Sequence, residues 1–142
     1  MAEVIVPKPA VSLVISELAA RLPGQGYSDV YVAGTRPTEA AGFAGVLPKR
    51  FVKITRVGGG MSNRVTDNAR ILVECWSDDS ADCEILANTV RAILGSLAGS
   101  NITLGQVRGV GNVDDGPSQF PDPLVPNYER WQFQVTVMVS TN

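Results

Sequence analysis

Three consecutive glycines between two arginines form the segment of this sequence that looks most like a ligand-binding loop. The segment RVGGGMSNRV covers residues 56–65. Glycine-rich loops beside positive charge often hold phosphates, because glycine lets backbone N–H groups approach the ligand closely. A P-loop, however, needs a Lys-Ser or Lys-Thr pair before a helix, and a dinucleotide loop needs G-x-G-x-x-G at the start of a helix. This segment has neither motif and a strand is predicted after it, so the pattern favours a flexible hairpin tip over a phosphate site.

The length of this predicted tip indicates a role in binding. The stretch VGGGMSNRVTDN is longer than a two-residue hairpin turn requires, and long tips on rigid strands often carry binding residues. Its flanking arginines could make charge-assisted contacts with acidic groups of a partner. The alternative is that they are solvated surface arginines, whose exposed ion pairs contribute little to stability. The residues of this candidate protein-contact site are Arg56, Gly58, Gly59, Gly60, Met61, Ser62, Asn63 and Arg64.

Other chemistry-bearing residues are few. The chain has no histidine, which removes the commonest general base and the commonest transition-metal ligand. Cys75 and Cys83 fall on predicted apolar faces, so both are interpreted as small core residues in a reducing compartment. We therefore expect no catalytic residue, no cofactor and no metal, and we predict that the protein is not an enzyme.

Two groups of acidic residues could suggest a divalent cation, but each has a simpler interpretation or the wrong spacing. The first group fits a helix N-terminus, where capping and the helix dipole favour carboxylates. The second lies in a proline-rich loop without the spacing of an EF-hand. The groups are Asp78, Asp79 and Asp82, and Asp114, Asp115 and Asp122.

Length and composition indicate one folded domain over residues 1–142, with 44% hydrophobic and 18% charged residues. The net charge of −2 lacks the basic excess that is typical of free nucleic-acid binders. The first residues, MAEVIVPKPA, lack the pattern of a signal peptide, and no apolar run approaches membrane-spanning length. We expect a chain that is made and folded in the cytoplasm.

Hydrophobic periodicity predicts two helices and up to five strands. Residues 9–24 and 78–99 carry apolar side chains at helical spacing, and Ser77 or Asp79 is a suitable N-cap for the second helix. The predicted strands are 28–34, 50–57, 68–77, 101–111 and 128–140, with loops over 35–50 and 112–127. This order predicts an α+β fold, a largely antiparallel sheet of four to five strands with two amphipathic helices packed on one face.

The predicted core joins the apolar stripes of both helices to one face of the sheet. Strands 50–57 and 68–77 are close in sequence, so they are expected to pair as an antiparallel hairpin. Trp131 and Phe133 share a face with three valines, which favours a core position over a base-stacking platform. The residues expected to bury each other are Leu18, Leu22, Leu86, Val90 and Ile93 against Ile71, Val73, Val135 and Val137.

Three segments over roughly residues 50–139 follow one another in a recognisable order. They are RFVKITRVGGGMSNRVTDNARILVECW, DDSADCEILANTVRAIL and FPDPLVPNYERWQFQVTVMV. This succession resembles the tail terminator proteins of long-tailed, siphovirus-type bacteriophages, especially those of actinobacterial hosts. The similarity lies in the order: a strand ending in glycines, a second strand, an acidic-capped helix, then a Pro-Asp-Pro loop before an alternating strand.

The resemblance implies a structural virion protein that forms a ring, expected to be a homohexamer. Such a ring caps the tail tube, ends its polymerisation and joins it to the head or neck. The implied partners are other copies of this chain, the tail tube protein and a neck or head-completion protein. Genome DNA would pass through the ring without sequence-specific binding, and assembly in the host cytoplasm would place the protein in the tail or neck of the virion.

Two alternatives stay open from the sequence. Within the same class, the chain could be a different neck protein, such as a head-completion or stopper protein. From another class, it could be a small enzyme or nucleotide-binding domain that uses the glycines at 58–60.

Overall fold

A computed structural model describes residues 4, 6, 9–37, 48–63, 66–97, 107–113, 116–123 and 127–140. Two α-helices, one short 3-10 helix (η1) and six strands lie in these ranges. They are α1 (Ala10–Arg21), η1 (Pro23–Gln25), β1 (Val30–Ala33), β2 (Arg50–Asn63), β3 (Thr66–Ser77), α2 (Ser80–Ser96), β4 (Val107–Val113), β5 (Ser118–Gln119) and β6 (Glu129–Ser140). Most of the loop predicted at 35–50 lies outside the described residues.

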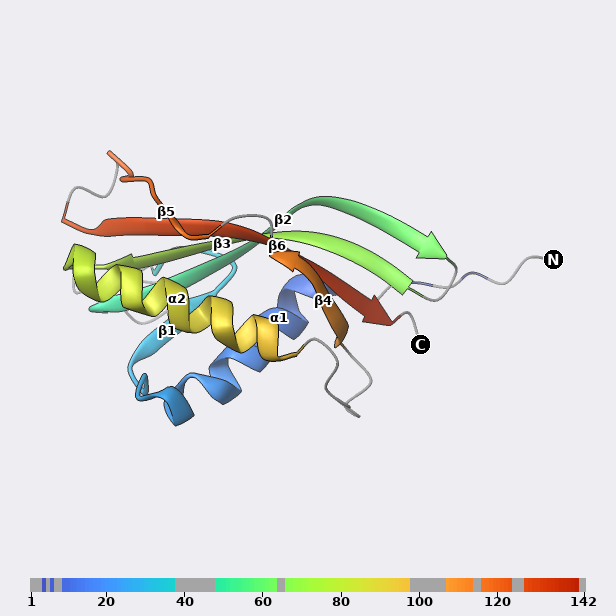
Figure 1. Ribbon diagram of the computed structural model, residues 1–142, viewed down its shortest axis with the longest axis horizontal. Coiled ribbons are helices and arrows are strands. Elements are labelled where there is room, and N and C mark those ends of the chain that lie inside the picture. The colour runs from blue at the N-terminus through green and yellow to red at the C-terminus, as the bar shows by residue number, and fades with distance from the viewer. Residues whose placement is uncertain are drawn as a thin grey trace.

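The described strands form one sheet in the order β1-β2-β3-β6-β4, and the two-residue β5 also pairs with β6. β1 and β2 pair in parallel, while the other pairs are antiparallel. The β2–β3 hairpin and β6 run along the long axis of the molecule (Figure 1). The predicted α+β class and the antiparallel hairpin are therefore confirmed.

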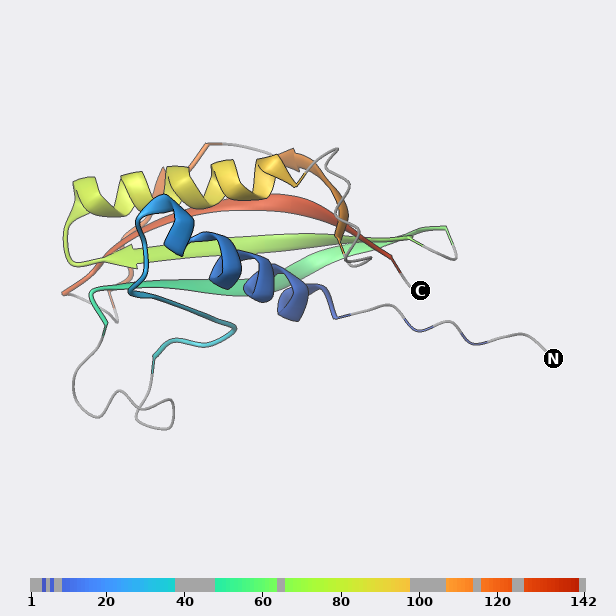
Figure 2. The ribbon, with the colours of Figure 1, turned by 90° about the horizontal axis from the view of Figure 1, so that it is seen from below.

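Both helices lie on the same face of this sheet (Figure 2). The side chains between the layers are buried because each helix is apolar on the side that faces the strands. Removing one large aliphatic side chain from water contributes about 1.5–3 kcal/mol, so this layer supplies most of the fold's stability. All nine residues predicted to bury each other belong to this core: Leu18, Leu22, Leu86, Val90, Ile93, Ile71, Val73, Val135 and Val137.

The start of α2 shows how the local sequence sets the end of an element. Asp79 is the N-cap, and its carboxylate accepts a hydrogen bond from the Asp82 N–H at 2.9 Å. Ser77, the other predicted cap, donates its hydroxyl to the Asp82 carboxylate at 2.6 Å instead. These side chains fix the first turn of α2 to the end of β3. Of the two predicted N-caps, Asp79 is the one that caps the helix.

The opposite face of the sheet carries a second, smaller apolar cluster. Phe51 and Trp76 stack with ring centroids 4.7 Å apart, and Tyr128 meets Phe51 edge-on at 5.4 Å. Both stacked rings are about 1% exposed. Trp131 and Phe133 belong to the helix side of β6, as predicted, where Phe133 is buried and Trp131 packs against the core. Among the described residues, the aromatic cluster of the outer face therefore lies around Phe51 and Trp76.

Candidate functional site

The glycine segment is a paired strand, and the prediction of a flexible tip at this place is wrong. Gly58, Gly59 and Gly60 of β2 lie opposite Arg70, Ala69 and Asn68 of β3. The pairing continues to Asn63 and Thr66, so only residues 64–65 connect the two strands. The sequence pattern misled because three glycines usually interrupt a strand, whereas here neighbouring strand pairs hold them in the ladder. The outer part of this hairpin projects beyond the ends of both helices (Figure 1).

A β-bulge at Val57 explains why a glycine is needed at position 59. The register shifts between Arg56 and Gly58, so Val57 and Gly58 together oppose Arg70. Gly59 follows with a φ of +91°, and a Cβ atom there would overlap the Asn68 carbonyl oxygen. Only glycine fits, because the backbone is left-handed and the partner strand is too close for any side chain.

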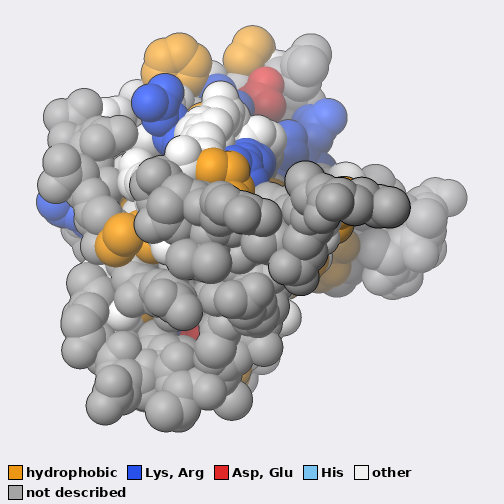
Figure 3. All heavy atoms as spheres, turned by 90° about the vertical axis from the view of Figure 1, so that its right-hand side faces the viewer, with side chains coloured by type: hydrophobic (Ala, Val, Ile, Leu, Met, Phe, Trp, Pro, Cys, Tyr) orange, Lys and Arg blue, Asp and Glu red, His pale blue; other side chains and the backbone are white. Residues whose placement is uncertain are grey.

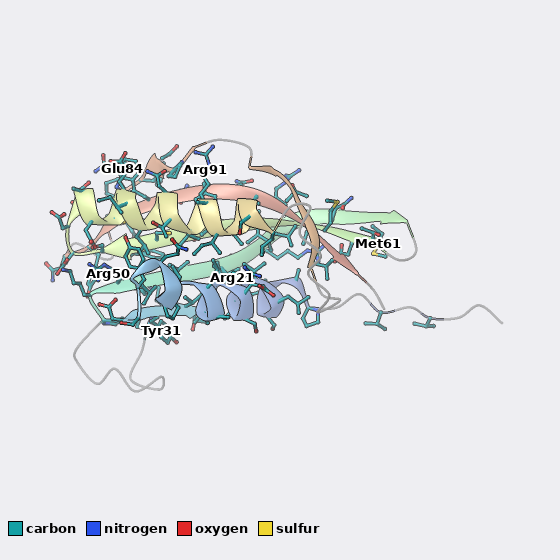
Figure 4. All side chains as sticks on the ribbon, turned by 60° about the horizontal axis from the view of Figure 1, so that its bottom comes forward. Arg21, Tyr31, Arg50, Met61, Glu84 and Arg91 are labelled. Atoms are coloured by element: carbon teal, nitrogen blue, oxygen red, sulfur yellow. The ribbon has the colours of Figure 1, made fainter. Side chains whose placement is uncertain are left out.

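The bulge changes which side chains face the helix layer. Before it, Val52 and Ile54 point into the core. After it, Met61 pairs with Asp67, which shares the helix side of β3 with the buried Ala69. Met61 nevertheless lies on the projecting part of the hairpin and is 46% exposed (Figure 4). The bulge therefore leaves an apolar side chain outside the core on the projecting hairpin.

Arg56 is used within the hairpin rather than offered to a partner. Its guanidinium donates two hydrogen bonds to the Asp67 carboxylate, at 2.7 and 2.9 Å, and its Nε donates to the Gly58 carbonyl at 3.1 Å. Asp67 is 2% exposed, and the hydrogen bonds from Arg56 hold the pKa of this carboxyl below its ordinary value. Neither of the two roles predicted for Arg56, partner contact or solvated surface residue, describes this internal pair.

A groove of about 480 Å³ separates the hairpin from the start of α1. Gly60 and Met61 line it from the hairpin, Arg56 and Asp67 contribute their ion pair, and residues 9–11 close it from the helix. The side of the hairpin that faces the start of α1 is thus apolar at Met61 and charged at the Arg56–Asp67 pair. Of the other predicted interface residues, Ser62 and Asn63 lie at the end of β2, and Arg64 lies outside the described residues.

The hairpin end carries basic and apolar side chains together. Figure 3 views the molecule from this end, where blue Lys and Arg groups and orange hydrophobic groups occur side by side over the described surface. Arg70 is exposed, and Val57 beside it is 44% exposed. This combination is typical of surfaces that contact protein.

The two cysteines are core residues, as predicted. Cys75 is fully buried, and burial raises the pKa of its thiol well above the ordinary value. The Cys83 thiol donates to the Cys75 carbonyl oxygen at 3.0 Å, and burial raises its pKa to about 12. Both thiols are therefore protonated at neutral pH, so neither supplies a thiolate nucleophile.

Three described members of the two acidic groups have structural roles: Asp79, Asp82 and Asp122. Asp82 accepts two hydrogen bonds from Arg50 at 2.8 Å, and Arg50 also donates to Asp29 at 3.0 Å. Asp122 lies 3.6 Å from Arg130; Asp114 and Asp115 lie outside the described residues. Within the described ranges no group of three or more cysteine or acidic side chains could hold a metal ion.

Sequence reasoning missed Arg50, which joins the beginnings of β1, β2 and α2. Its guanidinium also lies over the Tyr27 ring at 5.4 Å. In Figure 4 it lies at the end of the molecule opposite Met61. Its position at the first residue of a strand gave no signal, because its acidic partners Asp29 and Asp82 are 21 and 32 residues away.

Neither helix of the described chain has the length and apolar character needed to cross a bilayer. A scan of protein-family models and a search of curated proteins both return no match to this sequence.

Proposed function

We propose that this protein forms a ring of identical subunits that caps the tail tube of a long-tailed bacteriophage. The ring ends tube polymerisation and joins the tube to the neck, so the protein acts as a tail terminator. The succession of segments between residues 50 and 139 supports this assignment by resemblance. Its partners are other copies of itself, the tail tube protein and a neck protein.

One structural observation carries the proposal: a braced hairpin extends, with β6 beside it, beyond the ends of both helices (Figure 1). The hairpin is held by ladder pairing up to Asn63 and Thr66, by the pairing of β3 with β6 and by the Arg56–Asp67 pair. A rigid projection suits assembly, because less conformational entropy is lost when it docks. It also gives the subunit a surface unlike the rest of its exterior, which the head-to-tail contacts of a ring require.

The first test is the oligomeric state of the purified protein. We expect light scattering after size exclusion to give a closed oligomer, and negative-stain electron microscopy to show sixfold rings. Added to polymerising tail tube protein, the rings should shorten the tubes and bind at one tube end. A monomer at every concentration, or rings that leave tube length unchanged, would overturn the proposal.

Two further measurements separate the alternatives. Labelling in virions should mark the tube end nearest the head; a label at the capsid portal would indicate a head-completion or stopper protein. A nucleotide titration followed by tryptophan fluorescence should give no saturable change. Saturable binding would support the nucleotide-binding alternative.

A further inference from the structure

The two ends of the molecule differ in charge. At the hairpin end, Asp67 is neutralised by Arg56, while Arg70 is exposed and makes no ion pair with the described residues. At the other end, Asp82 is neutralised by Arg50. The remaining carboxylates around the start of α2 are exposed and likewise have no ion pair in the described chain: Asp78, Asp79 and Glu84. The hairpin end therefore carries an unpaired positive charge. The α2 end carries an excess of negative charge, because its three unpaired carboxylates outnumber the exposed Lys49.

Each end also exposes an aliphatic side chain beside the unpaired charge. The bulge places Val57 beside Arg70, and Val57 is 44% exposed. At the α2 end, Ile85 follows Glu84 directly and is 59% exposed. Figure 4 shows Glu84 and the projecting hairpin at opposite ends of the molecule. The two patches are thus complementary in charge and alike in apolar character.

An uncharged groove of about 390 Å³ extends from Ile85 along α2. It is lined by Ile85, Asn88, Thr89 and Ala92 of the helix and by Gln25 of η1. An aliphatic side chain can enter such a groove without desolvating a charge, so docking there avoids the cost of burying an unpaired charge.

Strand addition along the hairpin is a less suitable mode of contact. β1 pairs only with residues Arg50–Lys53 of β2, so the rest of that edge has no strand partner among the described residues. The bulge and the hydrogen bond from Arg56 to the Gly58 carbonyl interrupt the edge, and bulged edges resist pairing with another chain. The hairpin is therefore suited to docking through side chains.

We infer that the hairpin end of one copy docks on the α2 end of the next copy. In this contact Val57 enters the groove beside Ile85, and Arg70 faces Glu84. The inference rests on the proposed ring, since the two patches lie at opposite ends and so make a head-to-tail contact, which closes into a ring when the rotation between copies permits. The occupant is a second copy of this chain because the chain itself supplies both complementary surfaces.

Charge reversal tests the contact directly. Arg70→Glu and Glu84→Arg should each raise the protein concentration at half-assembly by about tenfold or more, because each brings like charges together across the interface. The double variant should restore assembly to within about threefold of the wild type, because the opposite charges face each other again. Arg36→Glu is the matched control, because it makes the same charge change at an exposed arginine outside both patches and should leave assembly unchanged.

Cysteine cross-linking gives an independent measurement. Val57→Cys mixed with Ile85→Cys should form a disulfide-linked dimer under mild oxidation, and the double-cysteine chain should form a ladder of linked subunits. The native thiols should not interfere because Cys75 and Cys83 are buried.

The outcomes separate this inference from the proposed function. Rings that form normally in both reversal variants, or that give no cross-link, would overturn the docking geometry while the ring function stands. A wild-type protein that forms no rings would overturn both.

Discussion

Arg56 and Asp67 form a two-bonded ion pair across the β2–β3 hairpin, at 2.7 and 2.9 Å, with the carboxylate almost completely buried. The pair links Arg56 to Asp67, which lies opposite Met61 on the projecting part of the hairpin. A buried carboxylate is tolerated only when it is paired and hydrogen-bonded. The buried Asp67 therefore requires the Arg56 guanidinium beside it. The guanidinium in turn fixes the Gly58 carbonyl, which ties the bulge to the same interaction.

Replacing only one partner of this pair should destabilise the protein. Arg56→Met leaves the Asp67 carboxylate buried without a counter-charge, and we expect the free energy of unfolding to fall by about 2–3 kcal/mol. This is below the about 3–5 kcal/mol of a fully buried pair, because the Arg56 side chain is 36% exposed. Urea unfolding at pH 7 measures the change.

The matched control for this variant removes both charges. Arg56→Met combined with Asp67→Leu should recover most of the lost stability, because an apolar pair leaves no uncompensated charge. An Arg56→Met protein as stable as the wild type would show that the pair does not brace the hairpin.

Stability should fall in acid, and the direction follows from two carboxyls. Hydrogen bonds from Arg56 lower the pKa of Asp67, and hydrogen bonds from Arg50 lower the pKa of Asp82, both from an ordinary value of 3.8. Below that value the unfolded chain binds protons that the folded chain does not, so the free energy of unfolding decreases as the pH falls through the folded-state pKa values. Above about pH 5 these two groups contribute no pH dependence.

Urea unfolding between pH 7 and pH 2.5 checks this expectation. The variant carrying Arg56→Met and Asp67→Leu should lose less stability over the acid range than the wild type, because one of the two groups is gone. Parallel curves for the two proteins would contradict the assignment of the acid effect to Asp67.

The layers and the core could be predicted from sequence because they depend on short-range periodicity. The stripe of α2 and the alternation of β3 and β6 each lie within one element, and each has one apolar side. The cap at Asp79 was also predictable because capping acts over three residues. A strand too short to show a period gives no such signal. The prediction of a loop over 112–127 therefore missed β5, which has only the two residues Ser118 and Gln119.

The geometry of the candidate site could not be predicted, because it depends on pairs across the hairpin. Three glycines between polar residues indicate a turn when only local propensity is considered. The contact that gives Gly59 its role is with the Asn68 backbone on the neighbouring strand. Likewise, Arg56 finds its partner at Asp67, eleven residues away, so no local pattern links them. Arg50 was missed for the same reason.

Both thiols should be unreactive in the folded protein. Cys75 and Cys83 are buried, and the pKa of each is raised, so at pH 8 an aromatic disulfide reagent should modify neither at an appreciable rate. In denaturant both should react at once. Rapid modification of one thiol in the native protein would show that the β3–α2 packing opens, and would revive a chemical role for that cysteine.

The bulge itself makes the sharpest prediction, because two adjacent glycines differ in what they permit. At Gly59, whose φ is +91°, a Cβ atom would overlap the Asn68 carbonyl and lie 2.8 Å from the Arg70 backbone nitrogen. At Gly60 a Cβ atom would meet nothing within 4 Å. Gly59→Ala should therefore lower the free energy of unfolding by about 2 kcal/mol or more, whereas Gly60→Ala should change it by less than about 1 kcal/mol in either direction.

The same two variants connect the bulge to assembly. If the bulge sets the direction of the projecting hairpin, Gly59→Ala should weaken ring formation even at temperatures where the variant is fully folded, while Gly60→Ala assembles normally. Circular dichroism establishes the folded fraction and light scattering gives the oligomeric state. Equal stability of the two variants would show that the close approach to Asn68 is relieved at little cost. Normal rings from a folded Gly59→Ala protein would show that the direction of the hairpin is not set by this glycine.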